Sequence, residues 1–239
     1  MPHKYGAIDP SPFSANQRIL ELLGAGSRVR GPGPGPKSPD VAGVVLDVGC
    51  STGYLAAELR SCGYSVYGIE AAPDAASEAA RYCDRVWTAD LDRLEALDCG
   101  RIFDVMVFAD ILEHTRDPEG NLKKLLPYLR EGGRVICSLP NIANWRVRLS
   151  LLLGRFDYTS VGILDESHLR FFTRRTAERM MSRLGLRIER MMVTPSILPY
   201  RLYRVYPLKW LDYALCRILP GFGAQQFIFV LRRSAGYGR

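Results

Sequence analysis

The first residues that could do chemistry lie in a short glycine-rich turn containing Asp47, Gly49, Ser51 and Gly53. A run of apolar residues typical of a buried strand precedes this turn, and a helical pattern follows it. Glycines at such a junction let backbone amides approach a ligand, and the start of a helix favours negative charge. Glu70 ends the next strand pattern, where a carboxylate can accept both hydroxyls of a ribose.

The acidic start of the turn argues against a dinucleotide. A dinucleotide-binding turn groups three glycines as GxGxxG to seat a pyrophosphate. Asp47 would repel a pyrophosphate, whereas its carboxylate suits the positively charged amino group of an amino-acid-like ligand. These residues therefore favour S-adenosylmethionine over NAD as the cofactor.

Two histidines are the candidate catalytic residues. His114 ends the cluster Asp110-Ile-Leu-Glu113-His114, and His168 lies in a segment rich in charged residues. Either imidazole could act as the base that takes a proton from an acceptor hydroxyl. Two other interpretations stay open: the cluster could hold a divalent cation or shape the cofactor pocket, and His168 could be a structural hydrogen-bonding residue. We predict no bound metal.

The elements that must position these residues alternate along the chain. Apolar strand patterns separated by helical ones imply a parallel sheet with right-handed crossovers. The predicted helices include 14–23, with Ser14 and Gln17 as its capping box, 54–63, 121–130, and one capped by Thr173. The strand patterns cover residues 44–49, 65–70, 85–90, 103–110, 134–140, 187–193 and 226–233.

Four ordered motifs carry a family resemblance. LDVGCSTG, GIE, the AD pair at 89–90, and FDVMVFADILEH followed by LREGGRVICSLPN resemble those of class I S-adenosylmethionine-dependent methyltransferases. The resemblance covers roughly residues 41–140. It implies a three-layer α/β/α Rossmann-like sandwich with a seven-stranded, mostly parallel sheet whose last strand is antiparallel.

The resemblance also implies roles for individual residues. The loop from Gly49 to Gly53 would hold the methionine part of S-adenosylmethionine, and Glu70 would bind the ribose. Asp90 would bind the adenine amino group and Leu91 its ring face. Two further residues, Ala109 and Asp110, would line the methionine side. Ser51 departs from the family, which most often has glycine at that position.

The segment after the fifth strand pattern is predicted to form a substrate lid over 141–173. It resembles methyltransferases of surface-polysaccharide and other sugar pathways, and its first half is similar to the methionine-biosynthesis protein MetW. The Asp-x-x-Glu-His cluster resembles the Glu-x-x-Glu-His site of ubiquinone-biosynthesis O-methyltransferases.

Charge is distributed unevenly along the chain. The first 140 residues hold 15 Lys and Arg against 19 Asp and Glu, whereas the rest hold 17 against 6. A basic carboxyl-terminal part suggests an anionic partner, and a solvated arginine-rich surface is the alternative. Aromatic, aliphatic and basic residues alternate in an insertion at 197–223. This insertion could contact an anionic membrane, a second subunit or the core.

Residues 1–40 are predicted to be a helix and a Gly/Pro linker that precede a methyltransferase domain at 41–239. The six cysteines show no zinc-ligand spacing. No signal-peptide or membrane-spanning pattern occurs, which predicts a cytoplasmic protein.

The predicted function is methyl transfer from S-adenosylmethionine to an oxygen of a small-molecule, sugar or lipid-linked acceptor. Methylation of a quinone-like ring, which metal dependence would favour, is a weaker option. The rival hypothesis is a MetW-like partner or regulator of another enzyme. A nucleic-acid partner is not expected, and the protein could be a monomer or a homodimer.

Overall fold

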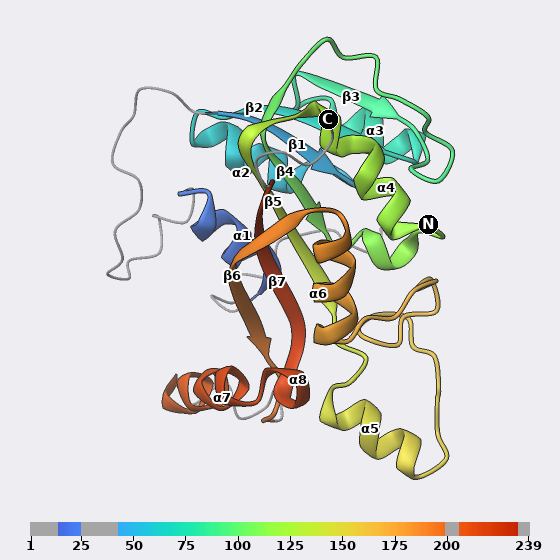
Figure 1. Cartoon of the computed structure of the whole chain (residues 1–239), viewed down its shortest axis with the longest axis vertical. Coiled ribbons are helices and arrows are strands. Elements are labelled where there is room, and N and C mark those ends of the chain that lie inside the picture. Colours follow the sequence, from blue (N-terminus) through green and yellow to red (C-terminus); the bar gives the residue numbers. More distant parts are fainter. Residues whose placement is uncertain (1–13, 25–42, 199–205, 234–239) are drawn as a thin grey trace.

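A seven-stranded sheet with helices on both faces forms the centre of the molecule (Figure 1). The computed structural model describes residues 14–24, 43–198 and 206–233. The strand order is β3-β2-β1-β4-β5-β7-β6, and β7 runs antiparallel to both its neighbours while the other strands are parallel. The predicted fold is confirmed. The strands are β1 Val44–Val48, β2 Ser65–Glu70, β3 Arg85–Thr88, β4 Phe103–Ala109, β5 Leu129–Pro140, β6 Leu186–Pro195 and β7 Ala224–Arg233.

Two helices begin at the capping residues that the sequence predicts. The Ser14 hydroxyl accepts the Gln17 amide at 3.3 Å before α1, and Thr173 forms a capping box with Thr176 before α6. The α-helices are α1 Ala15–Leu22, α2 Tyr54–Ser61, α3 Pro73–Ala79, α4 Pro118–Leu125, α5 Trp145–Leu152, α6 Arg174–Arg183, α7 Tyr206–Ile218 and α8 Pro220–Gly223. Short 3₁₀ helices cover Leu112–His114 (η1) and Leu126–Tyr128 (η2).

The predicted helix at 121–130 and the strand after it have wrong boundaries, and α4 begins at Pro118 rather than at residue 121. Residues 121–130 were expected to be helical and the following strand to begin at 134, but α4 ends at Leu125 and β5 begins at Leu129. Pro127 interrupts the α-helix because it lacks an amide hydrogen, and a 3₁₀ turn replaces the last α-helical turn. Leu129 then pairs with Phe103 at the edge of a register shift, and Gly132 adopts a φ of +69°.

Two apolar layers hold the sheet between its helices. On one face, Ile19 of α1 and Leu59 of α2 are completely buried against strand residues that include Val45. On the other face, Leu122 of α4 and Met181 of α6 are completely buried in the larger cluster. Burying these side chains supplies most of the driving force that fixes the strand ends.

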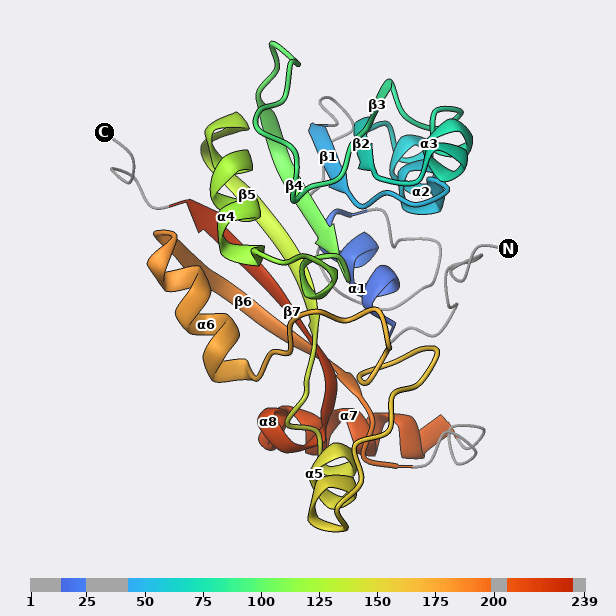
Figure 2. The same cartoon turned by 90° about the vertical axis from the view of Figure 1, so that its right-hand side faces the viewer.

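The helices α5, α7 and α8 gather at one end of the molecule, away from β3 and α3 (Figures 1 and 2). Among the described residues no helix is both long and apolar enough to span a bilayer. The predicted Gly/Pro linker at 31–39 lies outside the described residues, as do positions 199–205 of the predicted insertion. The proposed domain boundary between residues 40 and 41 therefore stays a prediction.

Candidate active site

A cavity of about 410 Å³ opens where β1, β2 and β4 end. Parallel strands place their carboxyl ends on the same edge of a sheet, which is where this type of fold forms its crevice. Seven of the eleven predicted site residues line it: Asp47, Gly49, Ser51, Glu70, Ala109, Asp110 and His114. The cavity is large enough for a cofactor of nucleoside size.

The turn between β1 and α2 needs its glycines. Gly49 has a φ of +77°, and a Cβ there would come within 2.7 Å of the Ile111 Cγ1. Gly53 has a φ of +83°, and a Cβ there would come within 2.7 Å of the Ala79 Cα. Ser51 also adopts a positive φ of 49°, a conformation that costs a residue with a Cβ about 1–2 kcal/mol. The turn therefore presents backbone rather than side chains to the cavity.

Two carboxylates share the wall of the cavity. Glu70 accepts the amides of Ser51 and Ala72, each at 2.9 Å, so it ties the glycine turn to the end of β2. Asp47 is only 2% exposed, and its Oδ2 has no hydrogen-bond partner within the described part of the chain. Burial, with the nearby Glu70 charge, raises the pKa of Asp47 to about 7. An uncompensated buried carboxylate of this kind favours a cationic ligand.

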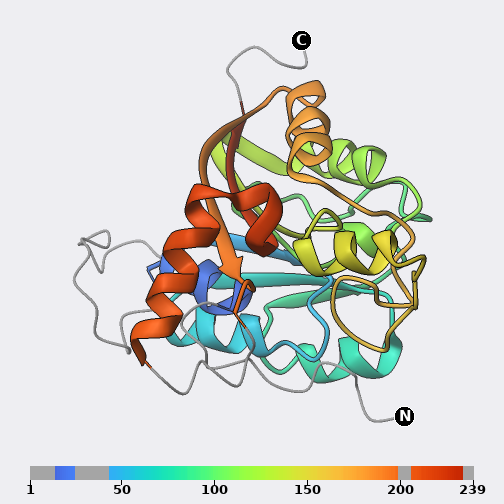
Figure 3. The same ribbon diagram turned by 90° about the horizontal axis from the view of Figure 1, so that it is seen from below.

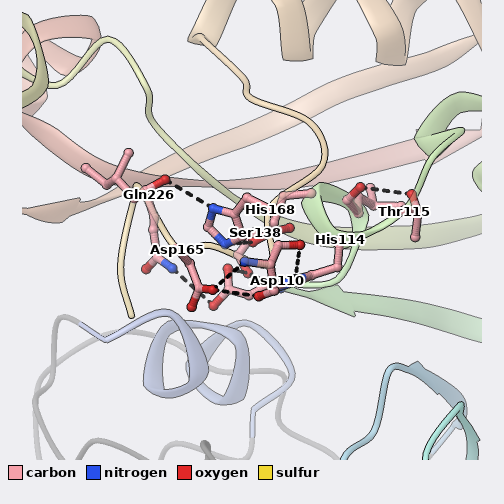
Figure 4. Close-up of polar contacts among 11 residues, drawn as sticks. Asp110, His114, Thr115, Ser138, Asp165, His168 and Gln226 are labelled. Carbon is pink, nitrogen blue, oxygen red and sulfur yellow. Dashed lines mark hydrogen bonds and ion pairs between the residues drawn. The ribbon is translucent and has the colours of Figure 1, made fainter. Parts of the chain in front are cut away.

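Asp110 is held in an unusual backbone conformation by two neighbours (Figure 4). Its φ is 52°, and its amide donates to the Ser138 hydroxyl at 2.9 Å. That hydroxyl donates in turn to the Asp110 Oδ1 at 2.6 Å, and the Gln226 side-chain amide donates to Oδ2 at 3.0 Å. Burial raises the pKa of Asp110, and these two hydrogen bonds oppose the rise. The contacts fix the carboxylate at the cavity wall.

The two predicted histidines meet although they lie far apart in the sequence. Their ring centroids lie 4.8 Å apart in an edge-to-face arrangement. His114 Nδ1 lies 3.2 Å from the Ser167 carbonyl oxygen, and His168 Nδ1 lies 3.1 Å from the Ile163 carbonyl oxygen. Because a carbonyl only accepts, each Nδ1 donates, and Nε2 carries the lone pair when the ring is neutral.

A buried glutamate lies beside this pair. Glu113 is 1% exposed, neither of its carboxylate oxygens has a hydrogen-bond partner in the described chain, and its Oε1 lies 4.0 Å from the His168 Nε2. Burial raises the pKa of Glu113 well above its usual value, and the charge of Asp110 adds to the rise. Burial lowers the pKa of His168, and so does His114. Ligating atoms of Glu113, His114 and His168 all lie within 4.8 Å of one another, so the three could hold a metal ion.

Four predicted site residues do not line the cavity. Gly53 packs against Ala79 of α3, and His168 contacts the ring of His114. Asp90 follows β3, where its carboxylate accepts the Asp92 amide at 2.9 Å, and Leu91 is packed in the core. Of the predicted site residues, Asp90 and Leu91 are thus the two that lie away from both the cavity and the histidine pair.

The structure adds residues that the sequence motifs did not single out. Tyr54 and Ile111 line the cavity. Each directly follows a predicted site residue, Gly53 or Asp110, so the sequence could have identified them. Asn16 comes from α1 and Ser167 from the predicted lid. Gln226 reaches Asp110 because β7 pairs antiparallel with β5, with Gln226 opposite Pro140. No local pattern predicts that pairing.

Comparison with known proteins agrees with this geometry. The family model described as a methyltransferase domain matches residues 16–190. A ubiquinone biosynthesis O-methyltransferase of Cereibacter sphaeroides is 32% identical over 101 residues, which cover 41% of this chain and 41% of that protein. A mitochondrial ubiquinone biosynthesis O-methyltransferase of Schizosaccharomyces pombe is 29% identical over 100 residues, covering 39% and 36%. The chain thus matches about two fifths of the length of these curated relatives.

Solved structures share the fold. Magnesium protoporphyrin IX methyltransferase from Synechocystis PCC 6803, crystallised with S-adenosylmethionine, has a TM-score of 0.54 at 16% identity, covering 92% of this chain and 78% of that one. A methyltransferase from Methanosarcina mazei has a TM-score of 0.56 at 17% identity, covering 80% and 92%. With the family match over most of the chain, the protein belongs to the methyltransferase-domain family, and it shares the fold of these class I methyltransferases.

Proposed function

We propose that this enzyme methylates an oxygen of a small-molecule, sugar or lipid-linked acceptor, with His168 or His114 as the base. The observation that carries the proposal is the histidine pair beside the cofactor cavity. The two rings come from segments far apart in the chain: His114 follows β4, and His168 lies between α5 and α6. A cavity that reaches His114 also favours catalysis over the MetW-like role, for which we would expect the pocket to be filled.

The cavity residues fit the cofactor. The unpartnered Asp47 Oδ2 would pair with the ammonium group of S-adenosylmethionine, because a buried carboxylate without a partner is costly. Glu70 has accepted two amides, which leaves lone pairs for ribose hydroxyls. The glycine turn, with Ser51, and the Ala109–Asp110 wall would enclose the methionine part. Adenine would lie toward Asp90 and Leu91, since the amide of the preceding Ala89 bonds to the Glu70 carbonyl at 2.9 Å.

A neutral histidine of this pair can accept a proton. Bound S-adenosylmethionine supplies a methyl group on a sulfonium sulfur, and the acceptor oxygen bonds to that carbon as the carbon–sulfur bond breaks. The hydroxyl proton would pass to the His168 Nε2, because the Nδ1 of this ring contacts the Ile163 carbonyl. Burial keeps His168 neutral and ready to accept. Glu113 Oε1 lies 4.0 Å from the same Nε2, so its carboxylate, when ionised, would stabilise the imidazolium that forms.

A second candidate is a metal-assisted methylation of a quinone-like ring. The convergence of Glu113, His114 and His168 favours it, because a carboxylate and two imidazoles suit a divalent ion of the first transition series. A cation held there would lower the pKa of an acceptor hydroxyl. The ubiquinone biosynthesis O-methyltransferases among the relatives are consistent with either route to an oxygen acceptor.

Calorimetric titration of S-adenosylmethionine and S-adenosylhomocysteine into the purified chain tests the cofactor assignment. Glu70→Ala should weaken both ligands by roughly 10- to 100-fold, because hydrogen bonds to a charged group are lost. Glu131→Ala, an exposed carboxylate at the start of β5, is the matched control and should bind normally. A folded wild type that binds neither ligand would refute the assignment.

The acceptor is then sought with radiolabelled S-adenosylmethionine. Sugar, lipid-linked and phenolic acceptors are screened with and without added magnesium or manganese, and the product is tested for an oxygen–methyl linkage. Transfer that a chelator abolishes would favour the metal-assisted candidate. Tight cofactor binding with no transfer to any class would favour the partner role.

A further inference from the structure

Exposed apolar side chains are concentrated at one end of the molecule. Among the described residues, 13 of the 16 exposed large hydrophobic side chains lie in 149–161 or 210–222. Leu152 of α5 is 82% exposed and Ile218 of α7 is 73% exposed. Exposed apolar side chains gathered in two short segments in this way indicate an interaction surface. The apolar surface comprises Leu149, Leu151, Leu152, Leu153, Phe156, Tyr158, Val161, Trp210, Leu211, Leu215, Ile218, Leu219 and Phe222.

Helices α5, α7 and α8, which carry most of this apolar surface, lie together at the lower end of the molecule, as the view from below shows (Figure 3). The start of α5 is fastened to α8, because the Asn144 side-chain amide donates to the carbonyls of Gly223 and Ala224. The Arg148 guanidinium lies 5.9 Å from the centre of the Phe222 ring. The helix α7 is anchored by Asp212, which is completely buried and accepts the amides of Ile197 and Leu198. These contacts hold the surface in a fixed shape.

Positive charge surrounds the apolar side chains. Within residues 145–161 and 206–223, the exposed side chains include four arginines, at 146, 148, 155 and 217. Among the described residues of these segments the only exposed acid is Asp157, because Asp212 is buried. Basic residues interleaved with leucine, tryptophan and phenylalanine are the composition of a helix that lies in the interface of an anionic membrane.

The charge also decides between occupants. A two-fold contact between copies would bring the four arginines of one chain against those of the other, which is repulsive. Nucleic acid would match the charge but not the exposed leucines. We propose that α5, α7 and α8 form a docking surface for an anionic lipid bilayer, with the apolar side chains inserted between the headgroups.

The docking surface is joined to the active site by one segment. After α5 the chain returns to the histidine pair, where the Leu169 amide donates to the Glu113 carbonyl at 2.8 Å. Resting on the proposed function, this continuity assigns the acceptor to amphiphiles whose apolar part stays in the bilayer while a hydroxyl reaches His168. Lipid-linked acceptors are thereby favoured over freely diffusing sugars.

Vesicle sedimentation of the full chain tests the docking surface. Vesicles of phosphatidylcholine alone are compared with vesicles containing phosphatidylglycerol, at low and high salt. Binding is expected to the anionic vesicles and to weaken with salt. The double variant Leu152→Glu and Ile218→Glu should reduce vesicle binding by more than about tenfold. The reason is that each native side chain would bury a large apolar group in the bilayer. Arg155→Glu and Arg217→Glu should each reduce it about fivefold or more.

Ile102→Glu is the matched control, because Ile102 is 56% exposed and lies before β4 at the other end of the sheet. It should bind vesicles as the wild type does. Calorimetry with S-adenosylmethionine checks that each variant is folded, and it separates a failure of docking from a failure of the enzyme assignment. Absence of wild-type binding to anionic vesicles would overturn the proposal. So would a dimer, in analytical ultracentrifugation, that the Leu152→Glu and Ile218→Glu pair dissociates.

Discussion

The two halves of the chain build their sites in different ways. In the cofactor half, residues 43–140, the cavity is lined by residues at or just beyond strand ends, such as Asp47, Glu70 and Asp110. In the acceptor half, residues 141–198 and 206–233, His168 comes from a long connection between α5 and α6. The first site is fixed by the sheet, and the second by contacts that the connection makes with it.

The halves also differ in charge and exposure. The unpartnered oxygens of the cofactor half belong to buried acids, including Asp47 and Glu113. The acceptor half carries the apolar surface and the four exposed arginines that lie within it. An acidic cavity suits a cationic cofactor, and a basic apolar face suits an anionic amphiphile. The difference leads us to expect that substitutions in one half change cofactor binding and those in the other change methyl transfer.

The largest expected effect is in the acceptor half. His168→Ala should lower the rate of methyl transfer by roughly 100- to 10,000-fold, the range for loss of a general base. The affinity for S-adenosylmethionine should not change, because His168 does not line the cofactor cavity. Single-turnover transfer to the acceptor found by screening and calorimetry measure the two quantities. Partial rescue by added imidazole would support a role in proton transfer.

His168→Ala would contradict the comparison if it weakened cofactor binding and transfer equally. That result would make His168 a structural residue of the connection. Full activity of the variant would instead leave His114 as the base.

The next effect concerns how closely the turn between β1 and α2 packs against α3. Gly53→Ala should lower the free energy of unfolding by about 2–4 kcal/mol, the sum of left-handed strain and overpacking against Ala79. Gly154→Ala is the matched control, because Gly154 has a φ of +71° and a Cβ there would have no other atom within 4 Å. Strain alone should cost this control about 1–2 kcal/mol. Urea unfolding monitored by circular dichroism measures both, and equal losses would show that the turn around Gly53 relaxes.

The same contrast explains what the sequence predicts. The strand-end residues of the cofactor half could be placed from local patterns, because an apolar run followed by a glycine turn specifies a strand, its end and the next helix. The contact of His168 with His114 could not be placed, since it depends on how the long connection between α5 and α6 folds back. Gln226 was missed for a related reason, as only the antiparallel pairing of β7 brings it to Asp110.

The predicted helix at 121–130 exists but ends at Leu125, for a local reason. Leucines at helical spacing extend past Pro127, where the sequence indicated a kink, and the missing amide hydrogen of this proline ends the α-helix instead. The leucine at 129 is buried, but as the first residue of β5. A buried position can thus satisfy a helical and a strand pattern equally, and proline decides between them.

A smaller effect is expected at Asp47. Its pKa of about 7 means that the ionised form, which pairs with the cofactor ammonium, becomes more populated as the pH rises through that value. Affinity for S-adenosylmethionine should rise over the same range. Asp47→Asn should flatten the profile and weaken binding above the pKa by roughly 10- to 150-fold, as for loss of a charged hydrogen bond. Methylthioadenosine, which lacks the amino-acid part, should bind both proteins equally.

In the unliganded chain the same carboxyl has the opposite effect. The folded state raises the pKa of Asp47 from 3.8 to about 7, so between these values the folded chain binds more protons than the unfolded one. Stability should therefore fall as the pH rises from about 4 to 7 and level off above that. Urea unfolding at several pH values should show this loss diminished in Asp47→Asn. An unchanged pH profile would mean that Asp47 is solvated.

The smallest effect tests whether the histidine pair is coupled. Burial is the main reason for the lowered pKa of His168, and the neighbouring His114 lowers it further. His114→Gln removes only the second cause, so the pKa of His168 should rise slightly and stay below its ordinary value. Proton NMR titration of the His168 ring measures this. An unaltered pKa would mean that the rings do not meet in solution. Repeating the titration with magnesium or manganese sharpens the test, because a cation on His168 Nε2 would suppress its protonation, whereas a free base would titrate as before.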